Sequence, residues 1–307
     1  MTGAPRVSVV MPMRDASAFL DAAIVSVLTQ TYTDFEFIIV DDGSRDESLW
    51  RARNHAAVDS RIAVIPRPSL GIVAALNLGI RQARGDLIAR MDADDVAAPT
   101  RFAKQVALLT ARPDVSVVGS FYTVIDNRGV SLRDMTLPAE SDAIRRTLAI
   151  CNCIAHPSVM MRRDAILAAG FYRDDFPLCE DYDLWLRLSE TSNLLNLPES
   201  LLFYREHPAQ WSWRDLERRL ESEVAVLRDA ARRRGDVPIA GGGLRAAVRA
   251  RAMLTARGAI GEGRRIAAVA ALRVAARQGL MPPMEAARWL RLAWKAGLLR
   301  TGGRGPS

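Results

Sequence analysis

Three carboxylates stand within four residues in the segment 90–95 (Arg-Met-Asp-Ala-Asp-Asp), which follows a short apolar run. A strand that ends in clustered carboxylates places several hard oxygen ligands at one edge of a sheet. These groups repel each other unless a divalent cation or hydrogen-bond donors neutralise them. The spacing therefore predicts a metal site of the kind that holds a diphosphate. We expect Asp92 and Asp94 to face the metal from one side of an extended segment, and Asp95 to cap a helix that begins near Pro99.

A second acidic pair, Asp41-Asp42, ends the apolar run 35–40 and is followed by Gly43 and Ser44. Ligands bind beyond the carboxyl ends of parallel strands, so the fold could bring both acidic groups to one crevice. One interpretation is a nucleotide site in which a carboxylate accepts hydrogen bonds from a base or ribose. The other is turn chemistry, because Asp bonds its own backbone and Gly tolerates positive φ. For residues 41–44 alone, the turn is favoured.

A third acidic group, Glu180-Asp181-Tyr182-Asp183, precedes an amphipathic helical pattern that contains Leu184, Trp185 and Leu188. A carboxylate at this place suits a general base, and a helix N-terminus would favour its ionised form. The alternative is that these acids only cap the helix and complement its dipole. The residues alone favour neither interpretation.

Composition places the chain among folded globular proteins. Its 307 residues are 49% hydrophobic and 25% charged, and the length allows one large α/β domain plus an appendage. Three cysteines without zinc-like spacing argue against a disulfide framework and for a reducing cytosol. The start of the chain has no secretory signal pattern, and no run of about 18 uncharged apolar residues occurs. We therefore expect a cytoplasmic protein without a membrane span.

Short apolar runs alternate with helical periods through the first half of the chain. Strands are predicted at 7–11 (stopped by Pro12), 35–40, 62–65 and 87–91, and helices at 46–57, at 71–83 and around Phe19 to Leu28. Strand followed by helix, repeated, is typical of a mainly parallel sheet. The predicted fold class is α/β, a mainly parallel Rossmann-like sheet flanked by helices, followed by an α-helical C-terminal region.

The charge is divided unevenly along the chain. Residues 1–214 carry 23 Lys and Arg against 27 Asp and Glu, a net charge of −4, whereas residues 215–307 carry 19 against 8, a net charge of +11. An Ala/Arg/Leu-rich helical pattern begins at the same place. We therefore predict a catalytic domain over 1–214 and a basic helical region over 215–307, with helices at 216–234, 244–257, 264–277 and 284–300.

The last of these helices carries Arg288, Arg291 and Lys295 on one face. This pattern is typical of a helix that lies on an anionic membrane surface. An ordinary helical bundle with solvated basic faces is the alternative. We do not expect nucleic acid as a partner, because no basic platform interleaved with aromatic residues accompanies the charge.

Several motifs, taken in order, resemble glycosyltransferase family 2, which has the A-type nucleotide-sugar fold (GT-A). They are residues 7–12, 26–31, 40–44, 85–95 and further stretches up to about residue 212. The resemblance implies an inverting transfer of a sugar from a UDP-, GDP- or dTDP-sugar donor. It also implies that Mg²⁺ or Mn²⁺ bridges the diphosphate. A growing bacterial cell-surface or lipid-linked glycan is the implied acceptor.

The resemblance assigns roles to individual residues. Asp42 resembles the carboxylate that faces the nucleobase, with Asp41 beside it, while Asp92 resembles the ribose-side residue and Asp94 the metal ligand. Asp181 matches the second member of the family's Glu-Asp pair, the base, and Glu180 the first. The remaining positions implied on the donor side are Pro12, Arg14, Arg90 and Ala93.

Two histidine segments match the family further along the chain. Segment 204–207 resembles its Tyr-Arg-x-His motif, which implies that His207 completes the metal shell and that Arg205 faces the diphosphate. His156 matches a segment on the sugar and acceptor side, with Trp185 assigned there too. For His156, a turn shaped by Pro157 is the alternative.

The chain departs from the family pattern at two places near the donor. Asp15 stands where Asn is common, and residues 67–71 replace a polar, Asn-containing turn. Arg14 either contacts the diphosphate or pairs with Asp15, and the pair is favoured.

Two other functions are alternatives to sugar transfer. A nucleotidyltransferase that forms nucleotide-sugars would need a Gly-rich, basic triphosphate loop after the first strand, which residues 12–16 are not. A non-catalytic membrane-surface scaffold would not require the acidic residues. The sequence therefore predicts a metal-dependent glycosyltransferase, cytoplasmic or peripheral on the inner face of the plasma membrane.

Overall fold

The computed structural model describes residues 4–207 and 216–235. Contacts divide the chain into two compact units. The first comprises Met1–Leu148, Asn152–Asp175 and Glu180–Ala209, and the second comprises Ala149–Cys151, Phe176–Cys179 and Gln210–Ser307. The predicted domain boundary after residue 214 stays a prediction.

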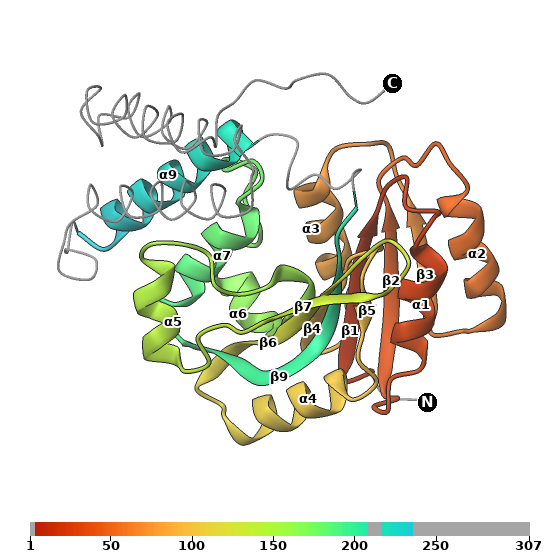
Figure 1. Cartoon of the computed structure of the whole chain (residues 1–307), viewed down its shortest axis with the longest axis horizontal. Coiled ribbons are helices and arrows are strands. Elements are labelled where there is room, and N and C mark those ends of the chain that lie inside the picture. Colours follow the sequence, from red (N-terminus) through yellow and green to blue (C-terminus); the bar gives the residue numbers. More distant parts are fainter. Residues whose placement is uncertain (1–3, 208–215, 236–307) are drawn as a thin grey trace, which may run out of the picture. The chain divides into compact units, whose positions relative to one another are not determined.

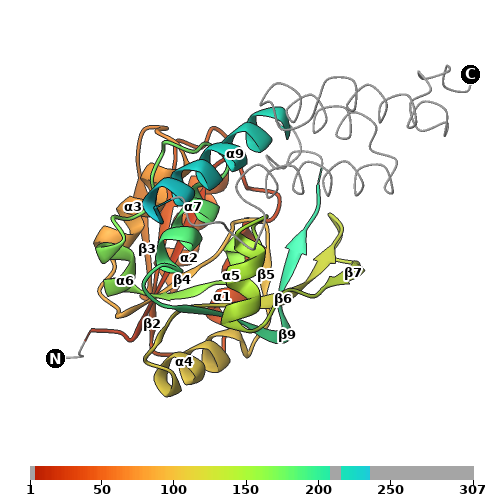
Figure 2. The same ribbon diagram turned by 90° about the vertical axis from the view of Figure 1, so that its left-hand side faces the viewer.

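The first unit is built on one sheet of nine strands. They are β1 (Val7–Met13), β2 (Phe35–Asp41), β3 (Ile62–Pro66), β4 (Leu87–Arg90), β5 (Val96–Ala97), β6 (Val115–Ile125), β7 (Ser131–Met135), β8 (Met160–Arg162) and β9 (Asn193–Arg205). The strand order is β3-β2-β1-β4-β8-β6-β9-β5, and β7 pairs with β6. Figure 2 shows the hairpin of β6 and β7 projecting at the edge of this sheet.

Helices cover both faces of the first four strands. The helices of this unit are α1 (Leu20–Leu28), α2 (Ser48–Val58), α3 (Ile72–Gln82), α4 (Arg101–Ala111), α5 (Ser141–Leu148), α6 (Arg163–Ala168) and α7 (Glu180–Leu188), with a 3-10 turn at His156–Ser158. Figure 1 shows α3 on one side of β1 and β2, and α1 and α2 on the other. Every residue of β1 and β2 is buried. Burial on both faces explains why these strands read as continuous apolar runs rather than as alternating patterns.

The predicted α/β class is confirmed, and the sheet is mixed beyond β4. Strands β3, β2, β1 and β4 run parallel. Strand β8 is antiparallel to both β4 and β6, and β9 is parallel to β6. The four strands predicted from apolar runs are therefore the parallel ones, and their carboxyl ends meet at one edge.

The prediction that Pro12 stops the first strand is wrong, because β1 continues to Met13. Pro12 pairs in register with Val40 of β2, whereas the pairing of β1 with β4 ends at Val10. A proline lacks the N–H that a ladder requires. It is accommodated here because β4 no longer flanks β1 at this point.

The second unit contains α9 (Leu216–Arg233), which matches the helix predicted over 216–234. The other three predicted helices, and with them the proposed membrane-binding face, lie outside the described residues. Among the residues that are described, no helix is long and apolar enough to cross a membrane.

Candidate functional site

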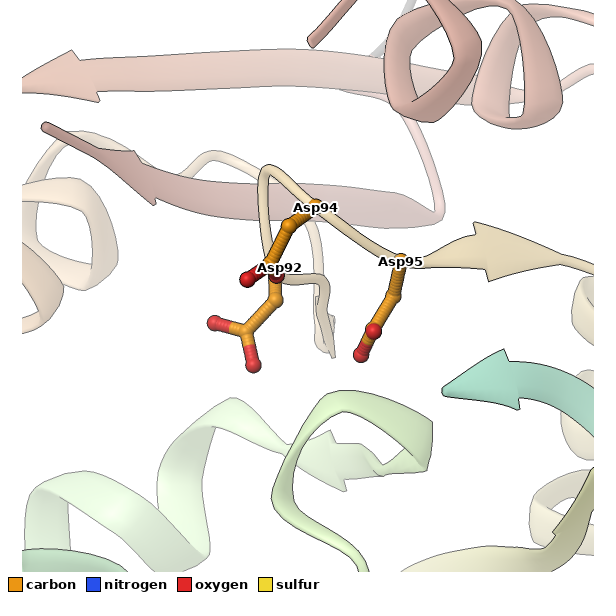
Figure 3. A group of neighbouring side chains, drawn as sticks. All are labelled: Asp92, Asp94 and Asp95. Atoms are coloured by element: carbon orange, nitrogen blue, oxygen red, sulfur yellow. The ribbon is translucent and has the colours of Figure 1, made fainter. Parts of the chain in front are cut away.

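The three carboxylates that follow β4 lie in a turn, residues 91–95, which we call the acidic turn. One ligand oxygen from each of Asp92, Asp94 and Asp95 lies within 4.8 Å of the others. Figure 3 shows the three side chains reaching from this turn towards the same side. The prediction that Asp95 caps a helix is wrong, because β5 intervenes and Thr100 is the N-cap residue of α4. Asp95 Oδ1 instead accepts a hydrogen bond from the backbone nitrogen of Arg205 at 2.8 Å.

Burial and mutual repulsion perturb the acidic turn strongly. Burial raises the pKa of Asp95 well above its usual range, and the charges of Asp94 and Asp92 raise it further. Burial also raises the pKa of Asp92, although the Arg90 guanidinium opposes that rise. Asp95 Oδ2 is buried and makes no hydrogen bond to the described part of the chain. A hard divalent cation neutralises the repulsion between buried carboxylates of this kind. The chemistry of the acidic turn therefore fits a divalent cation.

The two aspartates at the end of β2 each accept hydrogen bonds from a different loop. Asp41 accepts hydrogen bonds from the backbone nitrogen of Ser44, at 3.1 Å, and from its hydroxyl. Asp42 accepts hydrogen bonds from the backbone nitrogens of Leu70 and Gly71, both at 3.0 Å. Turn chemistry therefore describes Asp41, whereas Asp42 holds the loop between β3 and α3.

This loop also carries an arginine that sequence reasoning missed. Arg67 Nη1 lies 3.3 Å from Asp42 Oδ1, and the Arg67 side chain is 9% exposed. Arg14 donates to Ser69 Oγ at 2.6 Å and lies 3.8 Å from Asp15 Oδ2, which agrees with the favoured pairing. The loop 67–71 therefore fixes the surroundings of Asp42, and the role of Asp42 towards a nucleobase stays a prediction.

An open cavity of about 400 Å³ lies beside this loop, against α3. It is lined by Arg67, Leu70, Val73, Ala74, Asn77, Leu78, Arg81, Tyr172 and Asp174. Asn77 holds one wall, because its side chain donates to the backbone oxygen of Tyr172 at 2.9 Å and accepts from its nitrogen at 3.1 Å. The cavity thus extends from the ion-pair partner of Asp42 to Tyr172.

The N-terminus of α7 presents the third acidic group. Asp181 is half-buried, and its Oδ2 accepts a hydrogen bond from the side-chain nitrogen of Asn152 at 2.8 Å. Asp183 is fully buried and bonded to Arg173 and Arg187, so its role is structural. Eight of the nine residues of α7, all except Asp181, are buried, because α7 packs inside the unit. The predicted amphipathic pattern therefore has no solvent-facing side.

Arg90 connects the acidic turn with α7. Its side chain is 4% exposed, and its Nη1 lies 2.5 Å from Asp92 Oδ2. The charge of Arg90 lowers the pKa of both Asp92 and Glu180, and the charge of Asp181 raises the pKa of Asp92. Charges interact more strongly inside a protein than in water. The acidic turn, Arg90 and the N-terminus of α7 are therefore coupled electrostatically.

Because of Glu180, we expect the free energy of unfolding to depend on pH. Burial raises its pKa to about 7, and the charge of Asp181 adds to that rise. The folded chain therefore binds a proton that the unfolded chain has lost, so the free energy of unfolding falls as pH rises towards 7. Relative to wild type, Glu180→Gln should gain up to about 3 kcal/mol by pH 8 and nothing at pH 4. Denaturant titrations in EDTA measure this difference. The exposed Glu140→Gln is the control, and a Glu180→Gln difference independent of pH would contradict the prediction.

The end of β9 brings two more predicted residues to the acidic turn. His207 Nε2 lies 3.0 Å from Asp94 Oδ2. The Arg205 guanidinium donates to the backbone oxygens of Asp94, at 2.8 Å, and Asp126, at 3.0 Å. Arg205 thus holds the turn through its backbone. Its predicted contact with a diphosphate stays a prediction, as does metal ligation by His207.

The sequence profile of glycosyl transferase family 2 matches residues 8–168, more than half of the chain. The chain belongs to this family. It is 35% identical over 205 residues to the O-antigen biosynthesis glycosyltransferase WbnJ of Escherichia coli, covering 66% of this chain and 80% of that protein. It is 30% identical over 211 residues to the amylovoran biosynthesis glycosyltransferase AmsE of Erwinia amylovora, covering 68% and 79%. The chain is therefore a glycosyltransferase.

Solved structures share its architecture. Residues 1–349 of Staphylococcus aureus TarS superpose with a TM-score of 0.65 at 13% identity, covering 95% of this chain and 92% of that one. The mannosyltransferase PcManGT from Pyrobaculum calidifontis, in complex with GDP-Man and Mn²⁺, gives 0.62 at 18% identity, covering 97% and 82%. Identities this low concern the fold alone, and they confirm the predicted GT-A fold.

His156, Tyr172 and Trp185 form a buried aromatic group. A hydrogen bond of 2.8 Å joins His156 Nε2 and the hydroxyl of Tyr172, and the His156 ring lies edge-on to Trp185 with centroids 5.8 Å apart. Burial, and then the charge of Arg90, lower the pKa of His156 well below its usual range. His156 is therefore neutral. The turn shaped by Pro157 is present. The assignment of His156 to the sugar and acceptor side stays a prediction.

The remaining predicted positions line the strand ends. Pro12 and Ala93 are buried, at the end of β1 and in the acidic turn. Sequence reasoning missed Arg67, Asn152 and Tyr172. Their partners lie 25, 29 and 16 residues away in the sequence, so no local motif indicates these contacts.

Proposed function

We propose that this chain transfers a sugar, with inversion and with the help of Mg²⁺ or Mn²⁺, from a nucleotide-sugar to a growing surface or lipid-linked glycan. Two observations carry the proposal. The acidic turn, paired with Arg90, supplies clustered carboxylates, and Asp181, whose charge acts on Asp92, supplies a separate carboxylate held by Asn152. Displacement of a diphosphate from a sugar needs both kinds of group.

The donor class is supported by the fold and by relatives. PcManGT was solved with GDP-Man and Mn²⁺, and TarS with UDP-GlcNAc. In this chain the buried Nε of Arg90 and Nε1 of Trp185 make no hydrogen bond to the described residues. Such donors are suited to the oxygens of a sugar or phosphate group, because a buried donor without a partner costs free energy.

A divalent cation would be held by Asp94 and His207, with Asp92 and Asp95 beside them. Bound there, it would neutralise the charge that develops on the departing diphosphate. Asp95 is the buried member of this set, and the hydrogen bond from Arg205 fixes its Oδ1.

Asp181 is the proposed base. The acceptor hydroxyl oxygen attacks the anomeric carbon on the face opposite the diphosphate, and Asp181 takes the hydroxyl proton. As the new carbon–oxygen bond forms, the bond from the anomeric carbon to the diphosphate oxygen breaks, and the nucleoside diphosphate leaves. Asn152 donates to Asp181 Oδ2 and so stabilises its ionised form.

The acceptor class is inferred from relatives of similar length. WbnJ and AmsE are named for O-antigen and amylovoran biosynthesis, and the chain covers 80% and 79% of their lengths. Surface polysaccharide assembly is therefore the proposed context.

Melting temperatures of the full chain test the donor and metal parts of the proposal. With Mn²⁺, one of UDP, GDP, dTDP or CDP should raise the melting temperature, because a ligand that binds the native state stabilises it by about 2.7 kcal/mol at 100 times its Kd. The same nucleotide in EDTA should give a smaller shift. Equal shifts with and without metal, or no shift with any of the four, would count against the proposal.

A further inference from the structure

One aromatic ring contacts both Arg205, the last residue of β9, and His207, two residues beyond it. The guanidinium carbon of Arg205 lies 4.8 Å from the centroid of the Phe19 ring. The His207 ring centroid lies 4.9 Å from the same ring, with the two planes tilted by 48°. Neither the sequence motifs nor the family resemblance assigned a role to Phe19.

Phe19 itself is anchored on a different element. It is the N-cap residue of α1, its nitrogen donates to the backbone oxygen of Ala16 at 3.0 Å, and its oxygen accepts from Ala23 at 3.2 Å. Its side chain is half-buried. The backbone that carries the ring is therefore held by bonds that do not involve the acidic turn.

Each residue resting on Phe19 contacts the acidic turn directly. Arg205 binds the backbone oxygen of Asp94 and, through its own nitrogen, the carboxylate of Asp95. His207 lies 3.0 Å from the carboxylate of Asp94. A guanidinium over an aromatic face is attracted by the ring and loses rotamer freedom there. The ring thus limits the positions of two side chains, of which Arg205 holds the backbone of Asp94 and His207 faces its carboxylate.

We propose that Phe19 is a positioning residue for the divalent cation, acting through His207 and Arg205 on the acidic turn. This inference rests on the proposed function, because it takes Asp94 and His207 as metal ligands. Groups that orient metal ligands typically contribute 10- to 100-fold to metal affinity. Removal of the ring should therefore weaken the binding of the cation, even though Phe19 offers no ligand atom of its own.

The test measures Mn²⁺ binding to the full chain by calorimetry, without nucleotide, at a temperature at which circular dichroism shows each variant to be folded. Phe19→Leu and Phe19→Met should raise the Kd for Mn²⁺ about 10- to 100-fold. Phe19→Tyr keeps the ring and should bind like wild type. Val25→Ala, at an exposed position of the same helix, is the control and should also leave the Kd unchanged.

The outcomes separate this inference from the proposed function. Wild type that binds Mn²⁺ with the same Kd as a folded Phe19→Leu or Phe19→Met variant overturns the inference alone. A loss of affinity in Phe19→Tyr equal to that in Phe19→Leu also overturns it, because the ring would not be the cause. Wild type that binds no Mn²⁺ overturns the proposed metal dependence and the inference with it.

Discussion

Asp181→Asn is expected to abolish sugar transfer while leaving nucleotide binding intact. The substitution keeps the size of the side chain but removes the basic oxygen, and general bases contribute about 10²- to 10⁴-fold to rates. Nucleotide binding should persist, because Asp181 belongs to α7 and not to the acidic turn. Initial rates with a donor and acceptor, together with the Kd of the nucleoside diphosphate in Mn²⁺, measure the two effects separately.

The matched control for this experiment is Asp142→Asn. Asp142 is also an aspartate in the first turn of a helix, α5, but its side chain is exposed. Its replacement should leave turnover unchanged. Undiminished turnover in Asp181→Asn would remove Asp181 from the role of base. A parallel loss of nucleotide binding would instead point to a disturbed donor site.

Asp94→Asn is expected to abolish transfer and also to weaken Mn²⁺-dependent nucleotide binding. Asp94 Oδ2 faces His207, and its charge raises the pKa of both Asp92 and Asp95, so it is the electrostatic centre of the acidic turn. Loss of that charge would remove a proposed hard ligand of the cation, which would neutralise the charge on the departing diphosphate. We expect a rate loss of roughly 10³-fold, in the range measured for the removal of groups that stabilise developing charge.

Nucleotide titrations in Mn²⁺ and in EDTA distinguish Asp94→Asn from Asp181→Asn. In Asp94→Asn the affinity in Mn²⁺ should fall towards the value in EDTA. Asp86→Asn serves as the control, because the Asp86 side chain is 77% exposed on the same region of the chain and pairs only with Arg6 among the described residues. Full activity of Asp94→Asn would exclude it as a metal ligand.

The parallel half of the fold could be predicted because its signals are local. Apolar runs of strand length alternate with helical periods between residues 7 and 91, and each run became a strand of the parallel sheet. The acidic residues stand at the ends of those strands. The topology of such sheets then gathers them at one edge without any information about contacts.

The errors came where packing or a short turn decides the outcome. Asp95 was placed at a helix because the two-residue strand β5 is too short to give a periodic signal. The sequence pattern of α7 is amphipathic, but all of its residues except Asp181 are buried. In the fold, Asp183 and Arg187 satisfy each other inside the unit. Phe19 contacts Arg205 and His207, which lie near the other end of the first unit in the sequence. Residue spacing therefore gives no sign of this contact.

Arg205 and His207 lie far from the acidic turn in the sequence, and this separation has a consequence for synthesis on the ribosome. The backbone nitrogen of Arg205 pairs with Asp95 across 110 positions of the chain, and His207 meets Asp94 across 113. A nascent chain exposes its N-terminal part first, so Asp92, Asp94 and Asp95 emerge long before these two residues. Until β9 and the two residues after it are made, Asp95 lacks its hydrogen bond from Arg205 and Asp94 lacks its contact with His207. Completion of the contacts around the acidic turn is thus a late event in the synthesis of this enzyme.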